Sequence, residues 1–330
     1  MLQPTLKETG GRTKLSDSVS SGWKGGFQTL TALPSNIDAI EVVMKFYEGL
    51  NDHVAVFGPS GWGKTHMLHA AAELLRESRR DRTVFTTGLQ WATSSLRADT
   101  AETLILDDVQ DVLCHPRARH AFRQRLDLRI RTNKRTLLGW SSTDGLRKAR
   151  TVLPAVQQWT TAEIAEPLTS ERVLVAMQIA SVNGLQISRS VATLIARHLH
   201  GNGRSIVGAV QRLRLVKSNW TVNEDVISAC GVLSPYLLGQ NGWDPRDHVY
   251  DAVKRTLANT HAAFDTSELC SYLMLEEMGL GETEVATFLR VAPSTAYNWS
   301  RIVKLSLADP DLKLVLNACR NAVLCGFGED

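Results

Sequence analysis

A glycine-rich segment at residues 53–65, HVAVFGPSGWGKT, constrains the fold of this chain more than any other stretch. It begins with a short apolar run that predicts a buried parallel strand, passes through a loop, and leads into a helical run over residues 66–76. Glycines in such a loop let backbone N–H groups converge on phosphate oxygens at a helix N-terminus. Because strand, loop and helix occur in the required order, the segment predicts a Walker A phosphate loop that binds a nucleotide.

The side chains of this loop are expected to bind both phosphate and metal. Lys64 is predicted to reach the β- and γ-phosphates, and Thr65 to hold Mg²⁺. The other candidate nucleotide-binding residues belong to the loop and to the start of its helix, namely Gly58, Pro59, Ser60, Gly61, Trp62, Gly63 and His66. The expected cofactors are therefore ATP or ADP together with Mg²⁺.

A second apolar run, residues 103–106, ends in the carboxylate pair Asp107 and Asp108. Asp107 is predicted to orient Mg²⁺ and its waters, and Asp108 to polarise the attacking water. Both could be ordinary turn residues at a strand end, but their place after a phosphate loop favours the functional interpretation. For Ser141 and Ser142, which end the next strand, sensing of the γ-phosphate and a plain turn stay equally open.

Apolar runs alternate with helical patterns through the first half of the chain. Strands are predicted at residues 54–57, 83–87, 103–106, 135–140 and 162–165, and a helix at 117–132. This order predicts an α/β fold whose parallel sheet binds its ligand at the carboxyl ends of the strands. A short extended piece and an amphipathic helix are expected within residues 27–51, after a flexible leader at 1–26.

From residue 167 onward the pattern predicts helices only. Residues 170–181, a helix capped by Ser188 and residues 204–217 would form a small helical lid. A segment with proline and glycines at 234–243 marks a boundary. Further helices are expected at residues 246–257, 266–278, 282–289, 295–307 and 311–325. The predicted domains are thus 27–166 for nucleotide binding, 167–238 for the lid, and 243–330.

Composition excludes several classes of protein. Contents of 43% hydrophobic and 22% charged residues are ordinary for a soluble globular protein. Neither a signal peptide nor a membrane helix is expected, because no apolar run of the required length is present. The five cysteines, without metal-binding spacing, are expected to be reduced core residues. We therefore expect a cytoplasmic protein with no membrane partner and no structural metal.

Arg204 opens a predicted helix of the lid in the stretch GRSIVGAVQRL, residues 203–213. A positive charge in the first helical turn opposes the helix dipole, so the position is unfavourable unless an anion binds there. We therefore predict that Arg204 contacts phosphate, and we group it with Asp107 and Asp108 as candidate catalytic residues.

Taken together, these motifs resemble the DnaA family of AAA+ bacterial replication initiators over residues 27–325. The resemblance rests on PSN at 34–36, GPSGWGKTHMLH at 58–69, LILDDVQ at 104–110, GRSIVGAV at 203–210 and DPD at 309–311. It implies an AAA+ P-loop sheet domain with a helical lid, followed by an all-α helix-turn-helix domain for duplex DNA. The residues to which it assigns ATP and Mg²⁺ are Lys64, Thr65, Asp107 and Asp108. It also makes Ser141 and Ser142 the sensor-one region and Arg204 the sensor-two arginine.

The chain departs from this family in two respects that bear on assembly and turnover. The family's N-terminal domain is expected to have no counterpart in the leader at residues 1–26. Helicase recruitment by the family's usual route is therefore not expected. Where the family has a trans-acting arginine finger, this chain has Gln157 and Gln158. A neutral amide cannot stabilise charge that develops on phosphate as an arginine does. We therefore expect weak or slow hydrolysis and weakened oligomer formation, unless Arg147 or Arg150 substitutes.

A third departure concerns the reading of DNA bases. The family's Arg-Asp-His triplet at the start of the recognition helix is replaced by APS at residues 292–294, so its usual site should not be read. The side chains expected to face a DNA groove are Ser294, Thr295, Tyr297, Asn298, Arg301 and Lys304. The RDH triplet at 246–248 is predicted to lie on the first helix of this domain, away from the turn.

Charge is distributed unevenly along the chain. Residues 243–330 contain 8 basic and 13 acidic side chains, a net charge of −5, and alone should bind DNA weakly. Residues 117–150 contain 11 basic and 2 acidic side chains, a net charge of +9. A solvated helix face and a nucleic-acid contact stay equally open for this region. For the latter, single-stranded DNA is the expected ligand, with Arg123 and Arg129 as contact residues.

The sequence thus predicts an ATP-binding, DnaA-like DNA-binding protein that acts in replication initiation or its regulation. ATP would set how the DNA-binding domain is presented. The expected partners are duplex DNA, single-stranded DNA and a replisome or DnaA-type protein. The alternatives are a helicase loader or a plasmid or phage initiator, a transcriptional regulator with a structural AAA+ domain, and an accessory ATPase for transposition.

Overall fold

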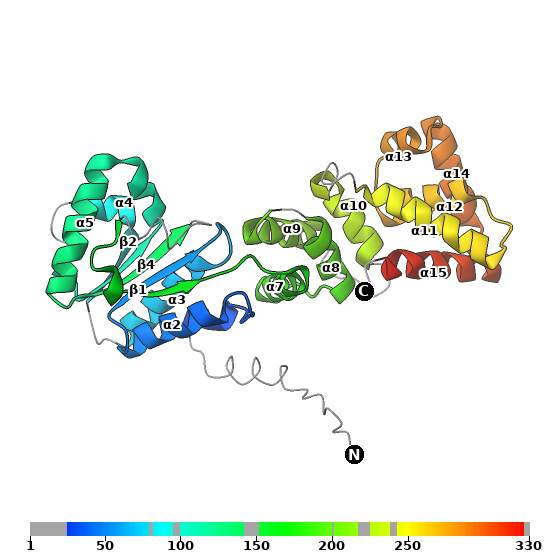
Figure 1. The fold of residues 1–330 in the computed structure, drawn as a ribbon. Helices are drawn as coiled ribbons and strands as arrows, with labels where there is room; N and C mark the ends of the chain where they lie inside the picture. Colours follow the sequence, from blue (N-terminus) through cyan, green and yellow to red (C-terminus); the bar gives the residue numbers. More distant parts are fainter. Residues whose placement is uncertain are drawn as a thin grey trace, which may run out of the picture. The chain divides into compact units, whose positions relative to one another are not determined.

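The computed structural model describes residues 25–78, 82–94, 100–141, 152–199, 201–216, 225–237 and 243–326. The chain forms two compact units, of which the first ends at Leu168 and the second begins at Thr169. Figure 1 shows the helices and strands of both units.

The first unit is built on a five-stranded parallel sheet with strand order β2-β3-β4-β1-β5. The strands are β1 (His53–Gly58), β2 (Thr83–Thr87), β3 (Thr103–Asp107), β4 (Arg135–Ser141) and β5 (Thr160–Glu163). All five predicted strands are confirmed, although β5 lies slightly earlier in the chain than its apolar residues indicated. The sheet brings the carboxyl ends of β1, β3 and β4 to one edge, which is where ligands bind in this class of fold.

Helices cover both faces of this sheet (Figure 1). On one face lie α2 (Ile37–Glu48) and α3 (Lys64–Glu77), and on the other lie α4 (Gly88–Thr93) and α5 (Pro116–Arg131). Every residue of β1 is consequently buried, as expected for a central strand of a parallel sheet. Short helical turns complete the unit: η1 (Gly25–Thr29), η3 (Val109–Cys114) and η4 (Val156–Gln158). The turn η1 replaces part of the extended piece that the sequence predicted.

The second unit contains helices only, within the residues that the structure describes. Its elements are α7 (Thr169–Val182), α8 (Arg189–His198), α9 (Gly203–Val216), α10 (Asp225–Leu237), α11 (Pro245–Thr260), α12 (Thr266–Tyr272), η5 (Leu273–Glu277), α13 (Glu282–Leu289), α14 (Pro293–Leu305) and α15 (Pro310–Cys325). Ser188 caps α8 by accepting a hydrogen bond from the backbone N–H of Val191, at 3.2 Å. Asp265 caps α12 through the N–H groups of Ser267 and Glu268, at 2.8 and 3.1 Å. The helices predicted for this half of the chain are confirmed, and α10 is additional.

Helix α10 is shared by two groups of helices. It packs against α8 and α9 of the predicted lid, and also against α11, η5 and α15. At Gly231 the approach is so close that a Cβ atom would overlap the carbonyl oxygen of Met278. The helix also continues through Pro235, inside the segment 234–243 that the sequence indicated as a boundary. The rest of that segment, residues 238–242, lies outside the described residues.

The cysteines are only partly as predicted. Cys230, Cys270 and Cys319 are buried, but Cys114 and Cys325 are exposed. Cys114 is the last residue of the turn η3, and Cys325 is the last residue of α15. The expectation that all five cysteines belong to the core is therefore wrong for these two.

Candidate functional site

The loop between β1 and α3 is folded tightly at the carboxyl edge of the sheet. Gly58, Gly61 and Gly63 have φ angles of 153°, 82° and 91°, a range that side chains disfavour. A Cβ atom on Gly58 would lie 2.6 Å from the carbonyl oxygen of Ile164. The glycines are therefore required by backbone geometry, and the loop has the form of a phosphate cradle.

Lys64 is the first residue of α3 and only 5% of its surface is exposed. Its ammonium donates hydrogen bonds to the carbonyl oxygens of Gly58 and Pro59, at 2.9 and 2.6 Å. A buried charge requires polar partners, and these carbonyls belong to the loop itself. The ammonium is therefore held at the place where the loop would receive phosphate.

The remaining loop residues differ in exposure. Ser60 and Thr65 are exposed, Pro59 is half-buried, and Trp62 is buried. Thr65 follows Lys64 directly, and its role as a Mg²⁺ ligand stays a prediction.

His66 has structural partners that the sequence did not reveal. Its Nε2 lies 2.8 Å from the hydroxyl of Thr29 and 3.0 Å from the carbonyl oxygen of Gly26. These contacts attach the turn η1 to α3, directly beside the phosphate loop. A contact between His66 and nucleotide stays a prediction.

Asp107 ends β3, which is separated from β1 by the intervening strand β4. The carboxylate reaches across because Gly139 of β4 has no side chain. A Cβ atom there would lie 2.9 Å from Oδ1 of Asp107 and 2.9 Å from Cδ2 of Leu68 in α3. Gly139 thus leaves the opening through which Asp107 faces the helix of the phosphate loop.

These residues fit a magnesium ion carried by a nucleotide. Mg²⁺ in such sites takes one or two protein oxygens and obtains its other ligands from phosphates and water. Thr65 and Asp107 would supply those protein oxygens. Among the described residues, no cluster of three or more His, Cys, Asp or Glu side chains could hold a metal by itself.

We expect Gly139→Ala to weaken binding of Mg²⁺-ATP by about tenfold, because the added methyl group must displace Asp107 or Leu68. Calorimetric titration with and without Mg²⁺ measures the effect. Without Mg²⁺ the variant and the wild type should bind ATP alike, since neither Asp107 nor Leu68 is expected to contact the nucleotide directly. Gly208→Ala is the control, because a Cβ atom on Gly208 meets no atom within 4 Å. Equal dependence on Mg²⁺ in all three proteins would contradict the role of Asp107.

Asp108, Gln110 and Ser141 form a hydrogen-bonded chain beside Asp107. Gln110 Nε2 donates to Oδ1 of Asp108, and the backbone N–H of Ser141 donates to Oε1 of Gln110, each at 2.9 Å. The backbone N–H of Asp108 donates to Oδ1 of Asp107, also at 2.9 Å. Sequence reasoning identified both carboxylates and Ser141 but missed Gln110. Ser142 lies outside the described residues.

The segment with Gln157 and Gln158 forms the turn η4, and both side chains are exposed. Trp159 next to them is buried, donates a hydrogen bond to the carbonyl oxygen of Pro154 at 3.0 Å, and packs on His53. The turn therefore presents two neutral amides to solvent. Arg147 and Arg150 lie outside the described residues.

Arg204 lies in the first turn of α9, in the second unit, and is exposed. Its backbone N–H donates a hydrogen bond to Oδ1 of Asn202, at 3.0 Å. Asn202 thus supports the helix start, so the backbone of Arg204 is held in place while its side chain is accessible to solvent. Its contact with phosphate stays a prediction.

The predicted nucleic-acid contact by Arg129 is wrong. Only 1% of Arg129 is exposed, because its guanidinium points from α5 into the edge of the sheet. It donates hydrogen bonds to the hydroxyl of Thr136 and to the carbonyl oxygens of Ala101, Glu102 and Arg135, at 2.7 to 3.2 Å. Arg129 therefore joins α5 to the starts of β3 and β4.

Arg125 also has a structural position on α5. It donates to the carbonyl oxygens of Trp91 and Ser94 and lies 4.8 Å from the Trp91 ring centroid. The exposed arginines of the helix are Arg117, Arg119, Arg123 and Arg131. Arg131 forms an ion pair with Asp127 at 2.8 Å. The basic surface of α5 is therefore smaller than its sequence indicated, and Arg123 is on that surface.

Helices α13 and α14 are joined by a short turn in which Arg290 has a left-handed backbone, with φ of 58°. Ala296, Ser300 and Val303 of α14 are buried, and α14 packs on α12. The opposite face carries the side chains predicted to contact DNA. Thr295 is half-buried, and the others are exposed, namely Ser294, Tyr297, Asn298, Arg301 and Lys304. Lys304 also forms an ion pair with Glu276 at 2.7 Å.

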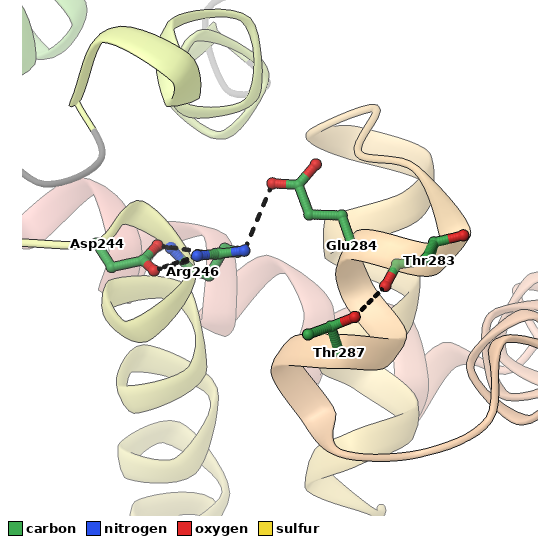
Figure 2. Close-up of polar contacts among 5 residues, drawn as sticks. All are labelled: Asp244, Arg246, Thr283, Glu284 and Thr287. Atoms are coloured by element: carbon green, nitrogen blue, oxygen red, sulfur yellow. Dashed lines mark hydrogen bonds and ion pairs between the residues drawn. The ribbon is translucent and has the colours of Figure 1, made fainter.

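Arg246 lies on α11, as the sequence indicated, but its guanidinium is close to the turn, because it lies 5.4 Å from the ring centroid of Phe288 near the end of α13. Figure 2 shows its guanidinium between Asp244 and Glu284, with closest N–O distances of 2.6 and 3.5 Å. The hydrogen bond with Asp244 raises the pKa of Arg246, so the pair stays charged. In the same view, the hydroxyl of Thr287 donates to the carbonyl oxygen of Thr283 at 2.7 Å. Arg246 thus connects the start of α11 to α13, which precedes α14.

Within the described part of the chain, no helix has the length and apolarity needed to cross a membrane.

No family model matches the chain. Curated relatives do match it over about half its length. The chromosomal replication initiator protein DnaA 2 of Chlamydia pneumoniae is 25% identical over 173 residues, which cover 48% of this chain and 38% of the relative. The initiator DnaA of Corynebacterium aurimucosum is 29% identical over 193 residues, covering 52% and 34%. The matched region thus spans only about a third of the length of these relatives.

The fold extends the similarity along the chain. A solved structure of the replication initiator DnaA bound to AMPPCP and single-stranded DNA aligns with 91% of this chain and 97% of its own, with a TM-score of 0.51 and 17% identity. At this identity the alignment establishes the fold alone, namely a parallel-sheet α/β unit followed by helices. In sequence over about half its length and in fold over most of it, this chain is similar to DnaA replication initiator proteins.

Proposed function

We propose that this chain is an ATP-binding and DNA-binding protein that acts in the initiation of DNA replication or in its regulation. The observation that carries the proposal is the opening at Gly139, through which the Asp107 carboxylate faces the helix that begins with buried Lys64. A phosphate cradle, a buried ammonium and a carboxylate for Mg²⁺ converge there, which is the requirement for a nucleoside triphosphate. The relative solved with AMPPCP supports this choice of ligand.

The proposed mechanism is a switch. Lys64 and the backbone of the phosphate loop would hold the phosphates in the first unit, and Arg204 of the second unit would contact them through its exposed guanidinium. ATP would then bias how the helices of the second unit are presented, since a ligand shifts an equilibrium by its differential contacts with the two states. Nucleotide binding would in this way control DNA binding.

Duplex DNA is the proposed partner of α14. Its exposed face carries Tyr297, Asn298, Arg301 and Lys304, which suit a groove contact. The surrounding residues 243–330 have a net charge of −5, so affinity should be modest and strongly dependent on salt. Single-stranded DNA is the proposed partner of the exposed arginines of α5, and the relative solved with single-stranded DNA supports that ligand.

Turnover is proposed to be slow. The exposed amides of Gln157 and Gln158 cannot replace an arginine finger, which contributes about 10³-fold or more in rate. The same substitution would weaken nucleotide-dependent oligomers. We propose a cytoplasmic, nucleoid-associated protein with a replisome or DnaA-type partner.

DNA affinity that depends on nucleotide is the expected result that tests this function. Selection of bound fragments from genomic DNA, with ATP, with ADP and without nucleotide, first identifies the target. On that duplex, Arg301→Ala should then lower affinity about 10-fold or more in fluorescence anisotropy, because a base-edge or phosphate contact is lost. Lys313→Ala on α15 is the matched control, since it removes an exposed positive charge away from α14.

The outcomes separate the candidate functions. Equal DNA affinities with ATP, with ADP and without nucleotide would support a transcriptional regulator whose AAA+ unit is structural. Binding that tolerates any sequence would instead fit an accessory ATPase for transposition. If Arg301→Ala removed a helicase, rather than DNA, from the complexes that the protein forms in cells, the result would support a helicase loader. Equal losses with Arg301→Ala and Lys313→Ala would contradict the assignment of α14 as the DNA-reading helix.

A further inference from the structure

We propose that Gln110 is a positioning residue for ATP hydrolysis, which holds the Asp108 carboxylate in place and ties it to the end of β4. This inference rests on the proposed nucleotide function of the site. The Gln110 side chain lies between Asp108 and Ser141 and bonds to both, but it is not one of the residues predicted to bind nucleotide or metal.

Asp108 needs external support because its backbone is in the left-handed region, with φ of 50°. Non-glycine residues in this conformation are costly and persist when their surroundings fix them. Two hydrogen bonds do so here: the backbone N–H of Asp108 donates to Asp107, and its side chain accepts from Gln110. Gln110 is itself placed by η3, whose residues Val109 and Val112 are fully buried.

The orientation of the Gln110 amide follows from its neighbours. The backbone N–H of Ser141 can only donate, so it must face Oε1, which leaves Nε2 to donate to the Asp108 carboxylate. A glutamine satisfies both neighbours with one planar group. An ionised glutamate in its place would still accept from Ser141 but would repel Asp108.

The connection links Asp108 to the phosphate loop. In the register of the sheet, Ser141 is the partner of Gly58, the first glycine of the loop. A movement of the end of β4 when the γ-phosphate binds would therefore pass through Gln110 to Asp108. With Oδ1 occupied by Gln110, Oδ2 is left to orient a water. That water's oxygen bonds to the γ-phosphorus as the bond to the ADP oxygen breaks, and its proton leaves toward Asp108.

The test uses the full-length protein and measures ATP affinity and the rate of turnover at saturating ATP. Gln110→Ala should lower turnover by about 10- to 100-fold, because the carboxylate loses its position. The dissociation constant of ATP should change less than about threefold, since Gln110 is not expected to contact phosphate. Gln124→Ala, an exposed glutamine on α5, is the matched control and should leave both quantities unchanged.

The pH dependence of turnover in Gln110→Glu distinguishes a positioning role from a purely structural one. Two adjacent carboxylates raise the pKa of one of them, so the variant should take up a proton as pH falls. Once protonated, the introduced carboxyl group can again donate to Asp108 and accept from Ser141. Turnover of this variant should therefore be low at about pH 7.5 and recover at about pH 5.5, relative to wild type at each pH.

Each result decides the matter. Unchanged turnover in Gln110→Ala, equal losses of affinity and turnover, or a flat pH profile in Gln110→Glu would overturn the inference. A wild-type protein that binds ATP without hydrolysing it would also overturn it, while nucleotide binding would stand. A wild-type protein that binds neither ATP nor ADP would instead refute the proposed function itself. Thermal melting of each variant identifies any that fail to fold, and the pH recovery of Gln110→Glu is then decisive.

Discussion

Replacement of Lys64 by alanine is expected to lower the affinity for ATP by at least about 100-fold. The buried ammonium would move from the carbonyls of Gly58 and Pro59 to the phosphates, where a charge-assisted contact in a dry site contributes on the order of 3 kcal/mol. Alanine is a good helix former and Lys64 is the first residue of α3, so the helix should persist. Calorimetric titration with ATP and ADP measures the loss.

The control for this prediction is Lys45→Ala. Lys45 is exposed in the last turn of α2 and is remote from the loop in sequence. It removes the same charge and should leave nucleotide affinity unchanged. If Lys64→Ala, shown by circular dichroism to be folded, bound ATP within about threefold of the wild type, the phosphate loop would not be the nucleotide site.

The second large effect is expected at Arg129, and it is an effect on stability. Arg129→Met should reduce the free energy of unfolding by about 3–5 kcal/mol, because three backbone carbonyls and the Thr136 hydroxyl lose a buried charged donor. Methionine keeps most of the aliphatic volume, so the loss reports on hydrogen bonding. Urea denaturation of the full chain, followed by tryptophan fluorescence, measures it.

Two other arginines of α5 provide the comparison. Arg119→Met changes an exposed side chain on the same helix and should alter stability by less than about 0.5 kcal/mol. Arg123→Met should likewise leave stability nearly unchanged but weaken retardation of a single-stranded oligonucleotide. If Arg129→Met left stability unchanged and Arg119→Met lowered it, α5 would be rotated differently about its axis.

The sequence did not show which arginines of α5 are buried and which are exposed. Basic residues occur on every side of α5, so helical periodicity alone could not tell which of them faces the sheet. The partners of Arg129 are mostly backbone carbonyls at the starts of two other strands, and a carbonyl carries no sequence signature. The exposed Arg123 and the buried Arg129 therefore look alike in sequence.

The phosphate loop and the carboxylate pair were predictable because their chemistry requires particular residues at fixed spacing. Glycines with positive φ, an adjacent lysine and a strand ending in aspartate were all identifiable in the sequence. Gly139 and Gln110 were not. Their roles depend on the placement of β4 between β1 and β3, which only the assembled sheet reveals. Similarly, Pro235 suggested an end to helical structure, but close packing of α10 keeps the helix intact through it.

The shared packing of α10 limits how this protein can be divided. Any fragment that begins at Trp243 would keep α11, η5 and α15 but lose the helix whose Gly231 fits against Met278. The apolar surface that α10 covers would then meet water, at a cost of about 25 cal/mol for each Å² uncovered. The helices proposed to read DNA are therefore not a portable module, and a transplant to another scaffold would have to carry α10 and its lid neighbours with it.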